Sequence, residues 1–161
     1  MTRAMIPWKM VTRSPEETIR LGRELGSRLQ KGDVIALFGD LGAGKTTITK
    51  GIAGGLGVVS DVFSPTFTIV HEHRGDTPLY HIDLFRLSGE DAADLGLDEY
   101  FASAGVCVVE WGERLSELAP GERLEIVMTF EGDDERAIEF VAHGERFQAL
   151  IEELKRDYSS D

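Results

Sequence analysis

A glycine-rich segment from Gly39 to Thr46 constrains the fold of this chain more than any other part of its sequence. It reads Gly-Asp-Leu-Gly-Ala-Gly-Lys-Thr and satisfies the phosphate-binding pattern G-x-x-x-x-G-K-[ST] at every required position. Glycines let the backbone curl so that successive N–H groups point toward phosphate oxygens. Such a loop requires a β-strand before it and an α-helix after it. The segment therefore predicts an α/β architecture built around a P-loop.

The residues on both sides of the loop meet these requirements. Val34 to Phe38 is a short apolar run, typical of a buried parallel strand. Ile48, Ile52 and Leu56 recur every four residues and Gly57 follows them, which predicts a helix and its end. Because both flanks fit, we favour a phosphate site over the alternative, a flexible glycine-rich turn between core elements.

Composition and charge narrow the functional classes. The chain has 161 residues, of which 42% are hydrophobic and 29% are charged, as expected for a soluble globular protein with one core. A net charge of −12 argues against direct, stable binding to nucleic acid. The single cysteine, Cys107, excludes an internal disulfide and agrees with a reducing cytoplasm. We expect one domain over residues 1–161, without a membrane span and located in the cytoplasm.

The rest of the chain predicts a mixed sheet. Ser14, Pro15 and Glu17 form a helix-start pattern with a capping box, and the apolar stripe that follows predicts a helix ending near Lys31-Gly32. Strands are expected at residues 63–70, 79–82 and 106–109, short helices at 90–101, an antiparallel hairpin at 124–142 and a C-terminal helix at 145–156. The predicted fold class is α/β: a P-loop NTPase-like three-layer fold with a mixed, partly parallel sheet.

Two acids end predicted strands. Glu110 follows the most apolar run of the chain, and Asp83 follows the strand expected at 79–82. A nucleotide hydrolase needs a carboxylate near its metal ion, and ligands bind outside the carboxyl ends of the strands in open α/β sheets. The alternative for Glu110 is an ordinary strand-end charge that pairs with Arg114. The alternative for Asp83 is a residue that simply precedes a turn.

Other polar and aromatic side chains give weaker signals. Thr66 lies in a segment that can close over the γ-phosphate like a switch loop, or it is an ordinary strand threonine. Trp111 either covers the site, meets a partner or packs in the core. His71 and His73 do not define a zinc site and are interpreted as residues of a solvent-facing strand surface. His81 and His143 are interpreted as structural residues.

Four segments together resemble the TsaE (YjeE) family. They span residues 39–47, 64–68, 80–87 and 109–111 and read GDLGAGKTT, SPTFT, YHIDLFRL and VEW. Their order and spacing also match, over roughly Ser14 to Ala142. The resemblance implies a small bacterial P-loop ATPase required for forming N6-threonylcarbamoyladenosine at position 37 of tRNAs that read ANN codons. It implies action with TsaD, which transfers the threonylcarbamoyl group, and with TsaB, while ATP hydrolysis resets the TsaD–TsaB complex.

The P-loop pattern and the resemblance together assign roles to individual residues, with ATP and Mg²⁺ as the implied cofactors. Catalytic roles are assigned to Lys45, Asp83, Glu110 and Thr66. Metal binding is assigned to Thr46, Glu110 and Asp83. Nucleotide contacts are assigned to Asp40, Leu41, Gly42, Ala43, Gly44, Lys45, Thr46, Thr47, Ser14, Arg136 and Trp111.

Two other functions stay open on the sequence: a small-molecule kinase and a non-hydrolytic nucleotide sensor. P-loop kinases of this size usually carry an arginine-rich lid, whereas residues 112–121 hold one arginine, Arg114. No Asn-Lys-x-Asp motif for reading guanine occurs, which favours ATP over GTP. No arginine is clearly placed as an internal finger, so we expect slow hydrolysis in isolation and faster turnover with partners.

Overall fold

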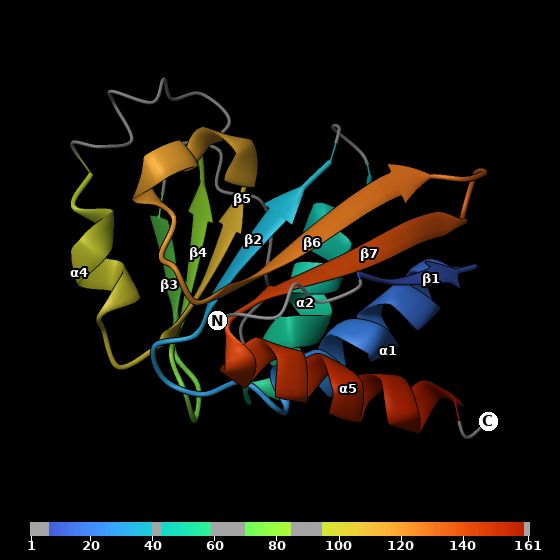
Figure 1. Cartoon of the computed structure of the whole chain (residues 1–161), viewed down its shortest axis with the longest axis horizontal. Helices are drawn as coiled ribbons and strands as arrows, with labels where there is room; N and C mark the ends of the chain where they lie inside the picture. The colour runs from blue at the N-terminus through green and yellow to red at the C-terminus, as the bar shows by residue number, and fades with distance from the viewer. Residues whose placement is uncertain (1–6, 40–42, 59–69, 85–94, 160–161) are drawn as a thin grey trace.

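The computed structural model describes residues 7–39, 43–58, 70–84 and 95–159. Within these ranges a seven-stranded sheet has the order β1-β7-β6-β2-β5-β4-β3 (Figure 1). The neighbours β4, β5, β2 and β6 run parallel, whereas β3, β7 and β1 each pair antiparallel to a neighbour. This mixed sheet confirms the predicted fold class. The strands are β1 (Trp8–Thr12), β2 (Val34–Phe38), β3 (Val70–His73), β4 (Leu79–Asp83), β5 (Val106–Glu110), β6 (Arg123–Phe130) and β7 (Arg136–His143).

Helices cover the two faces of the sheet to different extents. One face carries α1 (Pro15–Gly26), α2 (Lys45–Gly55) and α5 (Glu145–Ser159), whose buried side chains share one core with strands of both halves of the sheet. The opposite face carries α4 (Leu97–Phe101) and the 3₁₀ turns η1 (Gly112–Arg114) and η2 (Ser116–Leu118). In Figure 1, α4 lies beside β3, β4 and β5, away from α1, α2 and α5. The described structure thus has three layers around the parallel strands.

The burial of the strands follows from this layering. Every residue of β5 is buried, and so are the first four residues of β2, because side chains on both faces of these strands meet helices or turns. In β6 and β7, buried and partly exposed residues alternate, since helices cover one face there within the described chain. The alternation confirms the antiparallel hairpin expected between residues 124 and 142.

Helices α1 and α2 touch through glycines. A Cβ atom added to Gly26 would lie 2.3 Å from the carbonyl oxygen of Ile52. A Cβ atom on Gly51 would lie 2.2 Å from the carbonyl oxygen of Ile19. Real Cβ atoms do not tolerate such distances, so the close approach of the two helices requires glycine at these positions.

The start of α1 is capped as the sequence predicts. The N–H of Glu17 donates to Oγ of Ser14 at 3.1 Å, and the N–H of Arg13 donates to Oε2 of Glu17 at 2.5 Å. These two bonds satisfy N–H groups that a helix leaves without intrahelical partners. They fix the direction in which the chain enters α1.

Helix α1 ends earlier than its apolar stripe predicts. The helix ends at Gly26 instead of near Lys31-Gly32, and Ser27 caps it through a backbone N–H bond to the carbonyl of Arg23. Leu29 is still only 8% exposed, although it lies beyond the helix. Leu29 lies four residues after Leu25, as a helical residue would, but this spacing only reflects that its side chain packs in the core. A residue in a loop can be buried in the same way.

Other differences concern the sheet edges. β1 was not expected, because its alternation is too short to be read without its partner. It pairs with β7, and the ring of Trp8 stacks on that of Phe140 with centroids 5.2 Å apart. Of the strand predicted at 63–70, residues 63–69 lie outside the described chain, as do 90–94 of the predicted helices. No helix among the described residues is both long and apolar enough to cross a bilayer.

Candidate nucleotide-binding site

The P-loop region connects the end of β2 to the start of α2. Gly39 has φ of 144° and Gly44 has φ of 102°, which side-chain-bearing residues rarely adopt. A Cβ atom on Gly39 would also lie 2.5 Å from the carbonyl oxygen of Met128 in β6. The predicted contact residues Asp40, Leu41 and Gly42 lie outside the described chain. The described ends of the loop therefore require glycine for both their turn and their packing.

The N-terminus of α2 faces this loop. Gly44 is the N-cap residue and has no side chain, and its carbonyl accepts the N–H of Ile48 at 3.0 Å. The N–H groups of the first turn therefore have no intrahelical acceptor and, with the helix dipole, make an anion-binding end. Thr46 and Thr47 lie in this turn and are partly buried. Ala43, just before it, is buried.

Lys45 lies between the loop and an aromatic ring. The residue is only 5% exposed, and its Nζ donates to the carbonyl of Gly39 at 2.6 Å. The same ammonium lies 3.7 Å from the centroid of the Trp111 ring, a cation–π contact. Trp111 has φ of 62°, the one positive φ outside glycine among the described residues. The left-handed backbone of Trp111 directs its ring over the P-loop lysine.

The two predicted acids lie side by side at the same edge of the sheet. Register pairs the Cα of Asp83 with that of Glu110, and the Cα of Glu110 with that of Leu37, two residues before Gly39. Glu110 is 4% exposed and bonds through Oε2 to Nε2 of His81, whereas Asp83 is partly exposed. The structure therefore brings the P-loop ends, Glu110 and Asp83 together, as expected from their strand-end positions.

The donor set of this region suits a magnesium nucleotide. Among the described residues, no group of three or more histidines, cysteines and acids is arranged to hold a metal by itself. A hydroxyl from Thr46 and carboxylates from Glu110 and Asp83 are hard oxygen ligands. Mg²⁺ is typically held by one or two such protein groups together with phosphate oxygens and waters. The residues fit a metal that arrives with its nucleotide.

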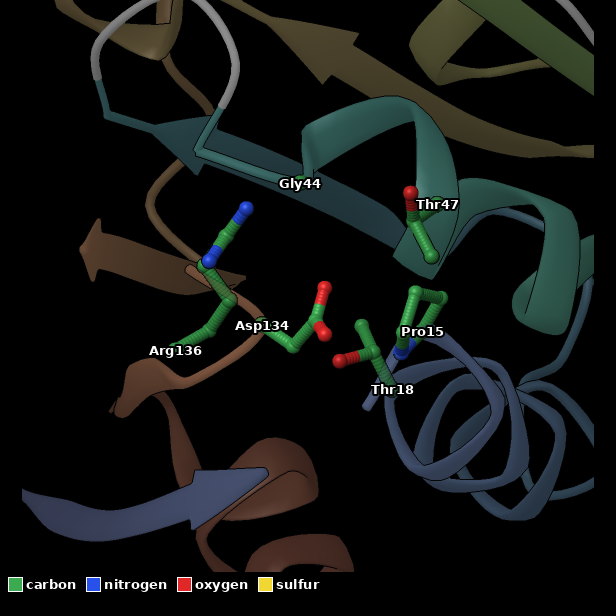
Figure 2. A pocket seen from close by; sticks show the side chains of 6 residues that line it. All are labelled: Pro15, Thr18, Gly44, Thr47, Asp134 and Arg136. Atoms are coloured by element: carbon green, nitrogen blue, oxygen red, sulfur yellow. The ribbon is translucent and has the colours of Figure 1, made fainter. Parts of the chain in front are cut away.

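A small hollow of about 40 Å³ opens beside the first turn of α2. Figure 2 shows Pro15 and Thr18 of α1 facing Asp134 and Arg136 across it. Its remaining lining comes from Gly44 and Thr47. The hollow extends from the N-terminus of α2 toward α1 and the β6–β7 turn.

Arg136 enters the hollow from the start of β7. Its Nη1 donates to three carbonyls of the preceding turn, those of Gly132, Asp133 and Glu135, at 3.2, 3.1 and 2.9 Å. Its guanidinium also stacks on Phe130, with Cζ 4.3 Å from the ring centroid. The predicted nucleotide residue is thus held by its own hairpin beside Gly44.

Two predicted site residues, Thr66 and Ser14, are not found among the residues that line the hollow. Thr66 lies outside the described chain. Ser14 uses its hydroxyl in the α1 cap, and its neighbour Pro15 lines the hollow instead. Sequence reasoning missed Thr18 and Asp134 as lining residues, because no pattern within the chain relates α1 to the hairpin turn.

The prediction that His71 and His73 both face solvent is wrong for His73, which is only 6% exposed at the end of β3. Burial raises the pKa of the Cys107 thiol to about 12, so it stays protonated at neutral pH and is a poor nucleophile. Burial, followed by the neighbouring His81 and His71, lowers the pKa of His73. The rings of His71 and His73 lie 5.7 Å apart on β3.

A scan against protein-family models matches residues 12–138 to the family described as "Threonylcarbamoyl adenosine biosynthesis protein TsaE". The chain belongs to the TsaE family. The matched span contains the P-loop, Asp83, Glu110 and Arg136. It therefore includes every described residue that we place around the loop.

Individual TsaE proteins are similar over most of their lengths. The tRNA threonylcarbamoyladenosine biosynthesis protein TsaE of Bacillus subtilis (strain 168) is 51% identical over 152 residues, covering 94% of each chain. The protein with the same description from Treponema pallidum (strain Nichols) is 41% identical and covers 81% of this chain and 97% of its own. The crystal structure of Bacillus subtilis YdiB aligns with a TM-score of 0.84 at 46% identity, covering 97% of this chain and 99% of that one.

Proposed function

We propose that this TsaE-family protein is a Mg²⁺-dependent ATP hydrolase that serves the formation of N6-threonylcarbamoyladenosine at position 37 of tRNAs reading ANN codons. The observation that carries the proposal is the meeting of three strand ends: β2 leads into the P-loop, β5 ends at Glu110 and β4 ends at Asp83. This is the edge at which open α/β sheets bind their ligands.

The binding of triphosphate follows from the first turn of α2. Its N–H groups and the helix dipole attract phosphate oxygens. Lys45 can exchange its bond to the Gly39 carbonyl for a charge-assisted bond to the β- or γ-phosphate. Burial strengthens the interaction of Lys45 with phosphate, because water screens a buried cation less than an exposed one.

The chemistry requires in-line attack of water on the γ-phosphate. Magnesium, when bound, neutralises charge on the phosphate oxygens and orients them. Glu110 and Asp83 would hold the metal ion and orient the attacking water. Lys45 and the α2 amides stabilise the negative charge that spreads over the transferred group. We expect slow turnover in isolation and faster turnover when protein partners complete the site.

The biological role rests on family membership and on charge. The relatives are described as tRNA threonylcarbamoyladenosine biosynthesis proteins. A net charge of −12 disfavours holding tRNA directly, so the chain acts on protein partners that hold the RNA. TsaD and TsaB are these partners in our proposal, and ATP hydrolysis resets their complex between turnovers.

Release of inorganic phosphate from ATP tests the enzymatic proposal. We expect slow release by the purified chain, faster release with TsaD and TsaB, and none above background for Lys45→Ala. Equal rates with and without the two partners would contradict the proposed partnership. Transfer of the phosphate to a metabolite would identify a kinase instead.

Mass spectrometry of tRNA from cells tests the biological proposal. Replacing the chromosomal copy by Glu110→Gln should abolish threonylcarbamoyladenosine at position 37 while nucleotide binding persists. Normal modification with blocked hydrolysis would instead identify a non-hydrolytic nucleotide sensor.

A further inference from the structure

His81 makes a buried contact with the acid at the end of the neighbouring strand. Its Nε2 bonds Oε2 of Glu110, and the two residues are 0% and 4% exposed. Register on the parallel strands β4 and β5 pairs Asp83 with Glu110, so His81 lies two residues before that pair. Since side chains alternate along a strand, His81 and Asp83 share a face of the sheet. The histidine therefore lies directly behind the edge where the P-loop and both acids meet.

The geometry indicates which way each group is oriented. A carboxylate only accepts hydrogen bonds, so with Glu110 ionised the N–H at Nε2 of His81 is the donor of this bond. The other ring nitrogen, Nδ1, is buried and makes no hydrogen bond within the described residues. The bond to Glu110 is therefore the one hydrogen bond that orients the ring within the described residues. That bond occupies Oε2 and leaves Oε1 as the second oxygen of the carboxylate.

Stability alone is a weak reason for such a pair. Burying a histidine and a carboxylate together costs desolvation, and a well-packed apolar pair often stabilises a core as well or better. The pair has a clearer use in orienting a carboxylate, because an acid that ligates a metal usually also accepts a hydrogen bond from a second protein group. The position of the pair next to Leu37 and the P-loop favours the orienting role.

We propose that His81 is a positioning residue for Glu110, holding Oε2 so that Oε1 faces the magnesium nucleotide; this rests on the function proposed above. His81 does not touch nucleotide or metal. It selects one orientation of a buried acid that would otherwise rotate about its side-chain torsions. This role revises the interpretation of His81 as a purely structural residue.

A second histidine–glutamate pair provides a matched control. Nε2 of His143 bonds Oε1 of Glu125 at 2.9 Å, also between neighbouring strands, β7 and β6. Here the side chains are 34% and 20% exposed, and the pair lies outside the P-loop edge. Substituting His143 therefore removes a histidine–glutamate hydrogen bond between two strands without changing any residue at the P-loop edge.

The test compares His81→Gln with His81→Asn in the full-length chain. The amide nitrogen of glutamine reaches about where Nε2 lies, whereas that of asparagine reaches only about as far as Nδ1. Affinity for the β,γ-imido analogue of ATP is measured with Mg²⁺ and with EDTA, and ATP hydrolysis is measured with TsaD and TsaB. We expect His81→Asn to lower the Mg²⁺-dependent affinity or the hydrolysis rate by about 10- to 100-fold. Affinity in EDTA stays unchanged, and His81→Gln and His143→Asn stay close to wild type.

The outcomes separate this inference from the proposed function. If wild type hydrolyses ATP and His81→Asn equals His81→Gln in every measurement, the positioning role is wrong and the ATPase stands. The same holds if His81→Asn lowers affinity equally with Mg²⁺ and with EDTA, since that is the signature of a general structural defect. If wild type neither binds the analogue nor hydrolyses ATP, the proposed function itself is overturned.

Discussion

The parallel strands β2 and β5 and the antiparallel hairpin of β6 and β7 belong to one sheet but lie in different surroundings. In β2, the neighbouring residues Val34 and Ile35 point to opposite faces and are 2% and 0% exposed. In β6, Ile126 is fully buried while the next residue, Val127, is only partly buried. Two helical layers enclose the first pair of strands and one layer covers the second, within the described chain.

The difference in burial between the parallel strands and the hairpin indicates which of them can hold catalytic groups. Two polar groups at the edge formed by the parallel strands are almost withdrawn from water: Lys45 at the start of α2 is 5% exposed and Glu110 at the end of β5 is 4% exposed. Charges interact more strongly there than on the partly exposed hairpin that carries Arg136, where solvent screens them. We therefore expect the parallel edge to carry catalysis and the hairpin to add modest binding.

The largest expected effect concerns catalysis at the parallel edge. Glu110→Gln should lower partner-stimulated ATP hydrolysis by about 10²- to 10⁴-fold, the range of a positioned acid–base group. Nucleotide affinity measured in EDTA should persist, because the P-loop amides and Lys45 are untouched. Phosphate release and analogue binding measure the two quantities. Glu125→Gln on β6 is the control, and an equal loss there would erase the distinction between the two halves.

Stability should differ between the outward faces of the two halves. Val34→Ala removes a buried side chain and leaves a cavity between two layers, which should cost about 2–3 kcal/mol of unfolding free energy. Val127→Ala removes a side chain that is already partly in water, so its cost should be below about 1 kcal/mol. Urea unfolding of both variants makes the comparison. Equal costs would show that the hairpin face is covered as well as the parallel one.

The stability of the protein at alkaline pH tests how well the parallel strands exclude water from Cys107. Folding raises the pKa of Cys107 to about 12 through burial. Its stabilising contribution is complete below the unfolded pKa near 9 and is lost as pH rises toward 12, because only the unfolded thiol ionises in that interval. The loss should be on the order of 1 kcal/mol at pH 10. In urea unfolding at pH 8 and pH 10, Cys107→Ala should show a correspondingly smaller decline.

The smallest expected effect concerns the hairpin. Arg136→Ala removes a guanidinium from the edge of the hollow and should weaken analogue binding by less than about tenfold, as for a solvent-screened charge. The catalytic rate at saturating nucleotide should hardly change. Titration with the ATP analogue measures the affinity, and the hydrolysis rate at saturating ATP measures the catalytic step. A loss as large as that of Glu110→Gln would place Arg136 in the catalytic machinery.

Local patterns predicted much of this fold because their causes are local. The apolar run before Gly39 and the four-residue spacing after Thr46 identify a buried strand and a helix on either side of the loop. Alternation along residues 124–130 identifies a half-covered strand. The misplaced end of α1 shows the limit, since Leu29 keeps helical spacing yet packs into the core from a loop.

The candidate site was predictable where a residue's place along its own strand decides its place in space. Glu110 and Asp83 end parallel strands, and parallel strands end at one edge, so their proximity follows from their positions. Thr18 and Asp134 meet across a hollow between α1 and a hairpin turn, and nothing in either segment encodes that meeting. His81 contacts Glu110 because β4 and β5 pair in one particular register.

The sequence by itself determined the glycine-rich loop, the strand and helix on either side of it and the two acids that end neighbouring strands. Glycine spacing and apolar periodicity act through backbone conformation and burial within a few residues. Only the tertiary structure decided that Trp111 lies over Lys45, that His81 holds Glu110, and that one half of the sheet is enclosed on both faces. These depend on strand order, register and helix packing, which arise from contacts between segments far apart in the chain.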